Sequence, residues 1–330
     1  MTTRNLFKSS PVAKIAEANP LTFFDIGTRG GFDSGLWPVA FATQAIGFEP
    51  NPVAFQKLTV QSDSIWKNTR ILPIAVSGEN GFRTLNVPSE PEGASLLEPA
   101  ILTGAARTKD QYFKIIETHQ VQTETMDQIL INFDLQTPDY LKIDIEGAEL
   151  EVLQSSPRTL DHLLAIKVEV FFDTVRVGQP LASEVMAFLQ SSGFMFMDFI
   201  APSHWRTDGY VVHPLLDKTS TPYARGQLMQ CDLFFLRRPS ELSLKQKDRV
   251  TRRLKLALIA MSFGYFDFAS EIFAEPEIEM ACKNLGCPNP LTANSACSKK
   301  LGRIESKKAF RSQLRGLGPF IRRLPDLIFS

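Results

Sequence analysis

The stretch Leu21-Thr-Phe-Phe-Asp25-Ile-Gly27-Thr-Arg-Gly30-Gly31 decides how the rest of this chain is interpreted. A short apolar run ends near Asp25 and continues into a turn that contains three glycines. Because glycine has no Cβ and tolerates positive φ, such a turn lets the backbone approach a ligand closely. By itself the pattern is not specific, since strand–glycine turn–helix units bind several nucleotide-like cofactors.

A second short apolar run adds weight to the first. Ala45-Ile-Gly-Phe-Glu49-Pro-Asn51-Pro places an acid about 24 residues after Asp25, the distance expected for a second parallel strand. The carboxylate of Glu49 would then accept the hydroxyls of a ribose. Asn51 and the proline after it are suited to begin a helix, the first as its cap and the second at its first position. The buried side of that helix is expected to hold Val53, Phe55 and Leu58.

The composition is that of an ordinary globular protein. Of 330 residues, 44% are hydrophobic and 22% charged, and the formal net charge is zero, which gives no argument for a nucleic-acid partner. Residues 1–20 lack the continuous apolar segment of a signal peptide, and the longest apolar run, 256–266, is shorter than the ~20 residues of a spanning helix. We therefore expect a soluble cytoplasmic protein. The cysteines lack a zinc-binding pattern and are expected to be free thiols: Cys231, Cys282, Cys287 and Cys297.

Apolar patterns and turn residues predict alternating strands and helices. Strands are expected at 21–26, 45–48, 71–76, 82–87, 119–123, 139–147, 165–172, 194–200 and 232–236. Helices are expected at 12–18, 36–43, from 51 onward, and at 125–131, 148–155 and 181–190. Such alternation predicts a mostly parallel sheet with both faces covered. The segments 88–117 and 201–229 are long and irregular, and long loops in a compact domain are usually functional.

Polar residues collect where the predicted strands end. In an open α/β sheet the ligand lies beyond the carboxyl ends of the strands. Acids at these positions also cap the helices that follow, so a purely structural role stays open for each of them. The residues concerned are Asp25, Gly27, Glu49, Ala75, Ser77, Asp144, Glu146 and Glu169.

Several motifs follow one another along the chain, namely Asp25-Ile-Gly27-Thr-Arg-Gly-Gly31, Gly47-Phe-Glu49-Pro-Asn-Pro52, Glu92-Gly-Ala-Ser95-Leu, Thr125-Met-Asp127, Tyr140-Leu-Lys-Ile-Asp144-Ile-Glu146-Gly147-Ala-Glu149 and Glu169. Together they resemble the FkbM-type methyltransferases. The resemblance covers roughly 21–238, and its most specific part lies between Tyr140 and Glu149.

The resemblance implies a seven-stranded Rossmann-like methyltransferase sheet, mostly parallel with its last strand antiparallel, and helices on both faces. It also implies S-adenosylmethionine as cofactor and methylation of a hydroxyl on a sugar, glycan or secondary metabolite. The methyltransferase domain would span 21–238, between a helical lead-in at 1–20 and a basic helical extension at 239–330. One departure is Arg29, where the family usually has Asn; its side chain either meets the methionine carboxylate of the cofactor or faces solvent.

Roles follow from the resemblance and from chemistry. Asp144 is our first choice for the base that takes the acceptor proton, and Glu146 the second; alternatively, both hold a divalent metal such as Mg²⁺. His119 and His162 are expected to be structural, while His204 and His213 are further base candidates in an irregular segment. We expect 88–117 and 201–229 to form the acceptor pocket. The cofactor would be bound by Asp25, Gly27, Gly31, Glu49, Asn51, Ala75 and Ser77.

The C-terminal 90 residues are strongly basic, with 16 Lys and Arg against 9 Asp and Glu. From Lys299 onward, basic residues alternate with Leu301, Ile304, Phe310, Leu314 and Leu317 at helical spacing. Such a helix either packs on its own domain or a second subunit, or lies on an anionic membrane surface.

Two other functions remain open. A nicotinamide-dependent oxidoreductase has a similar fold, although the G-x-G-x-x-G spacing is absent here. A non-catalytic adaptor that keeps the cofactor pocket is the other.

Overall fold

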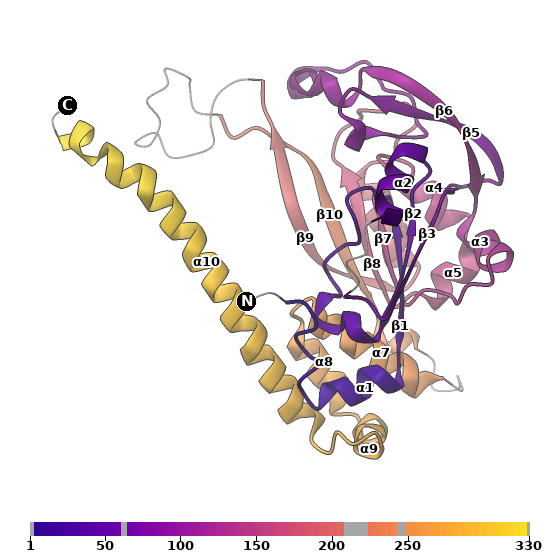
Figure 1. The fold of residues 1–330 in the computed structure, drawn as a ribbon, viewed down its shortest axis with the longest axis vertical. Coiled ribbons are helices and arrows are strands. Elements are labelled where there is room, and N and C mark those ends of the chain that lie inside the picture. Colours follow the sequence, from indigo (N-terminus) through magenta and orange to yellow (C-terminus); the bar gives the residue numbers. More distant parts are fainter. Residues whose placement is uncertain (1–2, 61–64, 208–223, 243–247, 329–330) are drawn as a thin grey trace.

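The central feature of the fold is a mixed sheet with one antiparallel strand. The computed structural model describes residues 3–60, 65–207, 224–242 and 248–328. In this part of the chain, seven strands follow the order β3-β2-β1-β7-β8-β10-β9, and β10 alone runs in the direction opposite to the other six. The predicted fold class is therefore confirmed (Figure 1). The strands are β1 (Leu21–Ile26), β2 (Thr43–Phe48), β3 (Asn68–Leu72), β7 (Tyr140–Ile143), β8 (Ala165–Phe171), β9 (Phe194–Trp205) and β10 (Gln227–Arg237).

Strand β1 lies inside the sheet, between β2 and β7, and all six of its residues are buried. Successive side chains of a strand point to opposite faces. Accordingly Phe23 packs into the hydrophobic cluster on one face and Phe24 into the cluster on the other. A strand that is apolar on both sides, with no polar alternation, is typical of a parallel sheet covered by helices on both faces.

Four helices from the middle of the chain cover the Phe24 face: α3 (Met126–Asn132), α4 (Glu149–Gln154), α5 (Pro157–His162) and α6 (Ala182–Ser191). Thr125 caps α3, since its side chain accepts a hydrogen bond from the Gln128 N–H. Helix α2 (Pro52–Val60) begins as predicted, but its buried residues are Ala54 and Leu58, while Val53 is exposed.

The other face is covered by the two ends of the chain. Helix α1 (Val12–Ala18), the 3₁₀ turn η1 (Trp37–Ala42), α7 (Arg249–Ser262), α8 (Phe266–Phe273) and α9 (Pro276–Asn284) contribute to the cluster around Phe23. Residues 256–261 of α7 are fully buried. These helices are core elements of the sheet domain, which differs from the expectation that 239–330 forms an appendage. The boundary at 238/239 therefore separates segments of sequence but does not separate hydrophobic cores.

A second, smaller sheet lies near the carboxyl ends of the main strands (Figure 1). It consists of β4 (Ala75–Val76), β6 (Ile115–Glu124) and β5 (Gly81–Pro88), in that order. The strand predicted at 71–76 is thus divided at Pro73, whose nitrogen carries no hydrogen to donate to a ladder: its first part pairs with β2 and its second with β6. The segment 88–117 contains the 3₁₀ turns η2 (Pro91–Gly93) and η3 (Gly104–Tyr112).

Three other expectations need correction. Residues 36–43 form a 3₁₀ turn containing Pro38 in place of an α-helix, and α5 was not expected as a separate helix. The segment 201–229 is less irregular than expected, because β9 continues to Trp205 and β10 begins at Gln227. His213 lies outside the described residues.

The last helix, α10 (Pro290–Ile328), starts on the helical layer and extends away from it (Figure 1). Its early residues Cys297, Leu301 and Ile304 are buried, whereas Phe310 and Leu314 are exposed. In the described part of the chain, none of the helices has the length and apolar character needed to cross a bilayer.

We predict that Leu258→Ala, in α7, lowers the free energy of unfolding by about 2–5 kcal/mol, because it leaves a cavity in a close-packed core. Leu314→Ala removes the same atoms from a residue that is 46% exposed and should change stability by less than about 0.5 kcal/mol. Urea denaturation of both variants measures the difference. Equal effects would contradict the assignment of α7 to the domain core.

Candidate functional site

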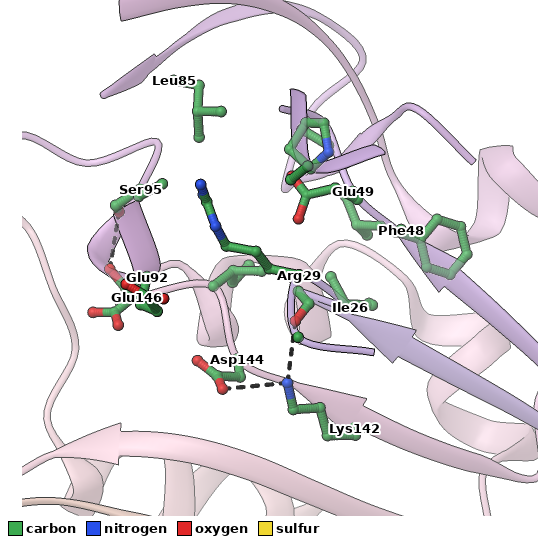
Figure 2. Close-up of a pocket in the computed structure, with 18 of the residues that line it drawn as sticks. Ile26, Arg29, Phe48, Glu49, Leu85, Glu92, Ser95, Lys142, Asp144 and Glu146 are labelled. Carbon is green, nitrogen blue, oxygen red and sulfur yellow. Dashed lines mark hydrogen bonds and ion pairs between the residues drawn. The ribbon is translucent and has the colours of Figure 1, made fainter. Parts of the chain in front are cut away.

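A cavity of about 670 Å³ opens at the carboxyl ends of β1, β2 and β7. Its wall includes the glycine turn after β1, Glu49 after β2, Ala75 and part of the 88–117 segment, and its floor carries Asp144 and Glu146 after β7. Figure 2 shows the side chains of Arg29, Glu49 and Asp144 around a common space. Residues from three separate regions of the sequence thus meet where the topology predicts a ligand.

The glycine turn is held against the turn after β7. Gly27 has φ +90°, and a Cβ built on it would lie 1.9 Å from the carbonyl oxygen of Asp144. Thr28 fixes the turn, because its hydroxyl donates to the Asp25 carbonyl at 2.5 Å and accepts from the Phe48 N–H at 3.0 Å. Sequence reasoning missed Thr28, since a threonine in a turn gives no signal by itself.

Asp25 is absent from the cavity wall. It is fully buried; its Oδ2 accepts from the Asp33 N–H at 2.7 Å, and its Oδ1 lies 3.5 Å from the Lys142 ammonium. Burial raises the pKa of Asp25 to about 6, although Lys142 opposes the increase. The structure thus places Asp25 behind the glycine turn, where it closes the loop from Gly27 to Asp33.

Glu49 faces the cavity, as expected for a group that accepts ribose hydroxyls. Its Oε1 accepts from the Asn51 N–H at 2.7 Å, and its Oε2 has no hydrogen-bond partner among the described residues. Burial raises the pKa of Glu49, while the Asn51 N–H and the Arg29 guanidinium lower it. Asn51 itself caps α2 by accepting from the Val53 and Ala54 N–H groups, so it supports Glu49 without lining the cavity.

Of Ala75 and Ser77, both expected to bind the cofactor, only the first lines the cavity. Ala75 lines the cavity, together with its neighbours Ile74 and Val76. Ser77 does not line it, and its hydroxyl instead contacts Arg83 and Glu151, which form an ion pair with each other. Gly31 lines the cavity with φ +97°.

Two half-buried lysines neutralise the floor of the site. Lys142 and Lys167 are direct neighbours on β7 and β8. The Lys142 ammonium lies 3.5 Å from Asp25 and 3.2 Å from Asp144, and that of Lys167 lies 2.6 Å from Asp33 and 3.2 Å from Asp232. Although burial disfavours the charged form, these carboxylates raise the pKa of both lysines. Both were missed as site residues, because a lysine in a strand is ordinarily assigned to an exposed edge.

Three acids meet next to this floor. One carboxylate oxygen from each of Asp144, Glu146 and Glu169 lies within 4.8 Å of the others. Glu146 pairs with the buried Arg176 at 2.9 Å. Burial raises the pKa of Glu146 to about 8, with Arg176 opposing and Asp144 adding to the increase. Glu169 is 9% exposed, its Oε2 has no hydrogen-bond partner, and its pKa is also raised by burial and by Asp144.

The backbone between these acids is shaped for the site. Glu146 has φ +63°, a left-handed conformation that costs a residue with a side chain energy and is often found at functional sites. The Glu149 carboxylate accepts from the Ile145 and Gly147 N–H groups and supports this turn. The Ser95 hydroxyl donates to the Glu146 carbonyl at 2.9 Å, which joins the 88–117 segment to the acids.

The other expected residues lie elsewhere. His119 is on β6, 3.1 Å from Glu117, and His162 ends α5, 3.9 Å from Asp139. His204 is exposed on β9. Of the two segments expected at the acceptor pocket, 88–117 contributes wall residues, whereas the described part of 201–229 contributes none.

A mostly parallel sheet with a glycine turn after its first strand and an acid after its second defines the class of α/β proteins that bind nucleoside-containing cofactors. Residues 35–196 match the family model of the methyltransferase FkbM domain. The chain therefore carries an FkbM-type methyltransferase domain, which confirms the resemblance seen in the sequence. The match begins after the glycine turn and ends before β10.

Among curated proteins, the chain is 26% identical over 147 residues to the hexuronic acid methyltransferase AglP of Haloferax volcanii. The alignment covers 44% of this chain and only 54% of that protein.

Solved structures with partial likeness include an rRNA methylase from Streptococcus thermophilus (12% identity, 72% of this chain and 98% of that chain, TM-score 0.33). Another is the N-terminal domain of EvdMO1 with SAH bound (10% identity, 70% of this chain and 81% of that chain, TM-score 0.31). At such TM-scores we draw nothing from them.

We predict that Gly27→Ala costs at least about 2 kcal/mol of unfolding free energy, because the new Cβ collides with backbone and φ is positive. Gly30→Ala is the matched control, since a Cβ there meets no atom within 4 Å. Thermal or urea unfolding of both variants provides the measurement. If both alanines are equally tolerated, the close approach of the two turns is not present in solution.

Proposed function

We propose that this protein is an S-adenosylmethionine-dependent O-methyltransferase that acts on a hydroxyl of a sugar or glycan. The observation that supports it best is the pairing, in one cavity, of an unpartnered Glu49 oxygen with a carboxylate cluster around Asp144. The first is suited to bind a ribose and the second to receive a proton. The match to the methyltransferase FkbM domain also supports methyl transfer.

The wall of the cavity suits the adenosine half of this cofactor. Glu49 would accept both ribose hydroxyls in charge-assisted hydrogen bonds. Ile74, Ala75 and Val76 offer an apolar surface for the adenine next to it. The volume of about 670 Å³ lies within the ~300–1,000 Å³ of typical small-molecule sites. When bound, S-adenosylmethionine supplies a methyl group on a positively charged sulfur.

Arg29 is assigned here to the methionine carboxylate of the cofactor. Figure 2 shows its side chain extending into the cavity between Glu49 and Ser95. Its guanidinium forms no hydrogen bond or ion pair with any described residue, and its positive charge lowers the pKa of Glu49. A planar guanidinium recognises a carboxylate through two parallel hydrogen bonds. Of the two alternatives that the sequence left for Arg29, this proposal takes the contact with the cofactor.

Methyl transfer needs the acceptor oxygen held in line with the bond that breaks. Positioning can contribute up to ~7–11 kcal/mol, whereas a general base contributes about 10²–10⁴ in rate. We therefore assign most of the rate to the walls that hold the acceptor, including Pro91, Glu92 and Leu96. Asp144 takes the hydroxyl proton, and Lys142, 3.2 Å from its Oδ2, keeps the carboxylate in place.

The acid cluster also offers ligands for a divalent cation. Asp144, Glu146 and Glu169 provide only carboxylate oxygens, which Mg²⁺ prefers. A cation held there would acidify the acceptor hydroxyl. Lys142 and Arg176 already neutralise two of the three acids, so the arrangement also works with a shared proton.

A relative of known activity supports a sugar as the acceptor. The Haloferax volcanii protein is a hexuronic acid methyltransferase, and the alignment with it covers about half of each chain. A sugar hydroxyl fits the polar floor of the cavity, where Asp33, Lys167 and Asp232 provide hydrogen-bond partners.

The cofactor assignment is tested by titration calorimetry of two variants with two ligands. Glu49→Gln should weaken both S-adenosylmethionine and methylthioadenosine by tenfold or more, because both carry the ribose. Arg29→Gln should weaken only S-adenosylmethionine, since methylthioadenosine has no carboxylate. NAD serves as the ligand for the oxidoreductase alternative.

Binding of NAD in preference to S-adenosylmethionine would overturn the proposed function. A protein that binds S-adenosylmethionine but transfers no methyl group to any sugar acceptor would support the adaptor alternative. If Arg29→Gln weakens the binding of both ligands equally, the role proposed for Arg29 is wrong, but the proposed function stands.

The base assignment predicts that Asp144→Asn lowers kcat by about 10²–10⁴ while the dissociation constant for the cofactor changes less than threefold. A protonated Glu146 can share its proton with the neighbouring Asp144 and so weaken it as a base. The wild-type rate should therefore rise with pH through about 8, where Glu146 loses this proton. The negative charge of Asp144 raises the pKa of Glu146. In Asp144→Asn this charge is absent, so the rise of the residual rate with pH should occur at a lower pH than in the wild type.

Rates with EDTA, and after addition of Mg²⁺, complete this experiment. Loss of activity with EDTA and recovery with Mg²⁺ would assign the three acids to a metal. Full turnover by Asp144→Asn would show that the base lies elsewhere.

A further inference from the structure

The last helix leaves the body of the protein partway along its length. Early in α10, Asn294 donates hydrogen bonds to the Phe266 carbonyl and the Ser270 hydroxyl, and Cys297 and Ile304 are buried. From 305 to 314 every residue is exposed. Figure 1 shows this part of α10 running away from the sheet and its helical layers. The alternative that this helix packs on its own domain therefore fails for these residues.

The exposed part of α10 combines large apolar side chains with positive charge. Phe310 is 60% and Leu314 is 46% exposed, and a spacing of four places them on one side of a helix. The stretch from 299 to 314 contains six basic residues and a single acid, Glu305, which pairs with Lys308. In the sequence, 315–328 continue with three more arginines and one aspartate. A helix of this kind is only marginally stable without a surface to pack on.

The charge decides between the surfaces that can cover it. A second copy of the chain would bring a second cluster of the same sign close to the first, and like charges repel. A nucleic acid would neutralise the basic residues but would leave Phe310 and Leu314 without an apolar environment. An anionic bilayer meets both requirements, since its headgroups attract Lys and Arg and its acyl region accepts apolar side chains.

We propose that the 299–314 part of α10 binds the surface of an anionic membrane, with Phe310 and Leu314 inserted and the basic residues at the headgroups. The helix would lie in the plane of the surface. This proposal does not depend on the methyl transfer. If the protein both binds the membrane and transfers a methyl group, membrane binding brings it close to acceptors that the membrane carries.

The test is co-sedimentation of the full chain with vesicles. Vesicles of phosphatidylcholine with 30% phosphatidylglycerol should bind at least tenfold more protein than pure phosphatidylcholine, and raising the salt to about 0.5 M should release it. Lys307→Glu/Lys308→Glu/Arg311→Glu should abolish binding. Phe310→Ala/Leu314→Ala should weaken it at least fivefold.

A matched control reverses three exposed lysines on other elements, Lys8→Glu/Lys67→Glu/Lys114→Glu, and should keep its binding. All variants should unfold at the wild-type temperature, because the altered side chains on α10 do not pack against the body. Equal loss of binding in the control would overturn the proposal. So would a failure to bind anionic vesicles, a stable dimer broken by Phe310→Ala/Leu314→Ala, or tighter binding to RNA than to the vesicles.

Discussion

The site depends on the close approach of two turns, the one after β1 and the one after β7. Gly27 leaves no room for a Cβ against the Asp144 carbonyl, so the two segments touch through backbone. The first turn carries Arg29, which is assigned to the methionine carboxylate of the cofactor, and the second carries Asp144, which is assigned to the proton transfer. Since both belong to neighbouring strands of one sheet, their separation is set by the strand spacing and does not need a flexible loop to form it.

Buried charges support this contact. The lysines of β7 and β8 lie side by side, and four carboxylates, those of Asp25, Asp33, Asp144 and Asp232, surround them. A buried ammonium without a partner is costly, and so is a buried carboxylate. Each lysine therefore offsets the cost of burying the carboxylates around it, and the carboxylates offset the cost of burying the lysine. The floor of the cavity is polar, and these ion pairs hold it in place. Dipoles and charges that are already oriented do not have to reorganise during a reaction.

The segments outside the FkbM match belong to the same folded domain. The match ends at residue 196, yet β10 completes the sheet and α7 fills the layer beneath it. A sheet that is apolar on both faces requires two covers. The middle of the chain supplies one, and the two ends of the chain together supply the other. The N- and C-terminal segments are therefore required by the sheet itself, whatever the substrate.

The sequence by itself determined the strands, the covered sheet and the family, because apolar runs, glycine turns and the Asp144-Ile-Glu146-Gly147 pattern are local signals. Of the site residues that it indicated, Gly27, Glu49, Asp144 and Glu146 line one cavity in the structure. Only the tertiary structure decided that Asp25 and Ser77 turn to structural partners and that Lys142 and Lys167 form the floor. It also decided that the C-terminal helices enter the core. Those outcomes depend on which strands become neighbours and on which side chains meet across more than 100 residues of chain, as Lys142 and Asp25 do, and no local pattern contains that information.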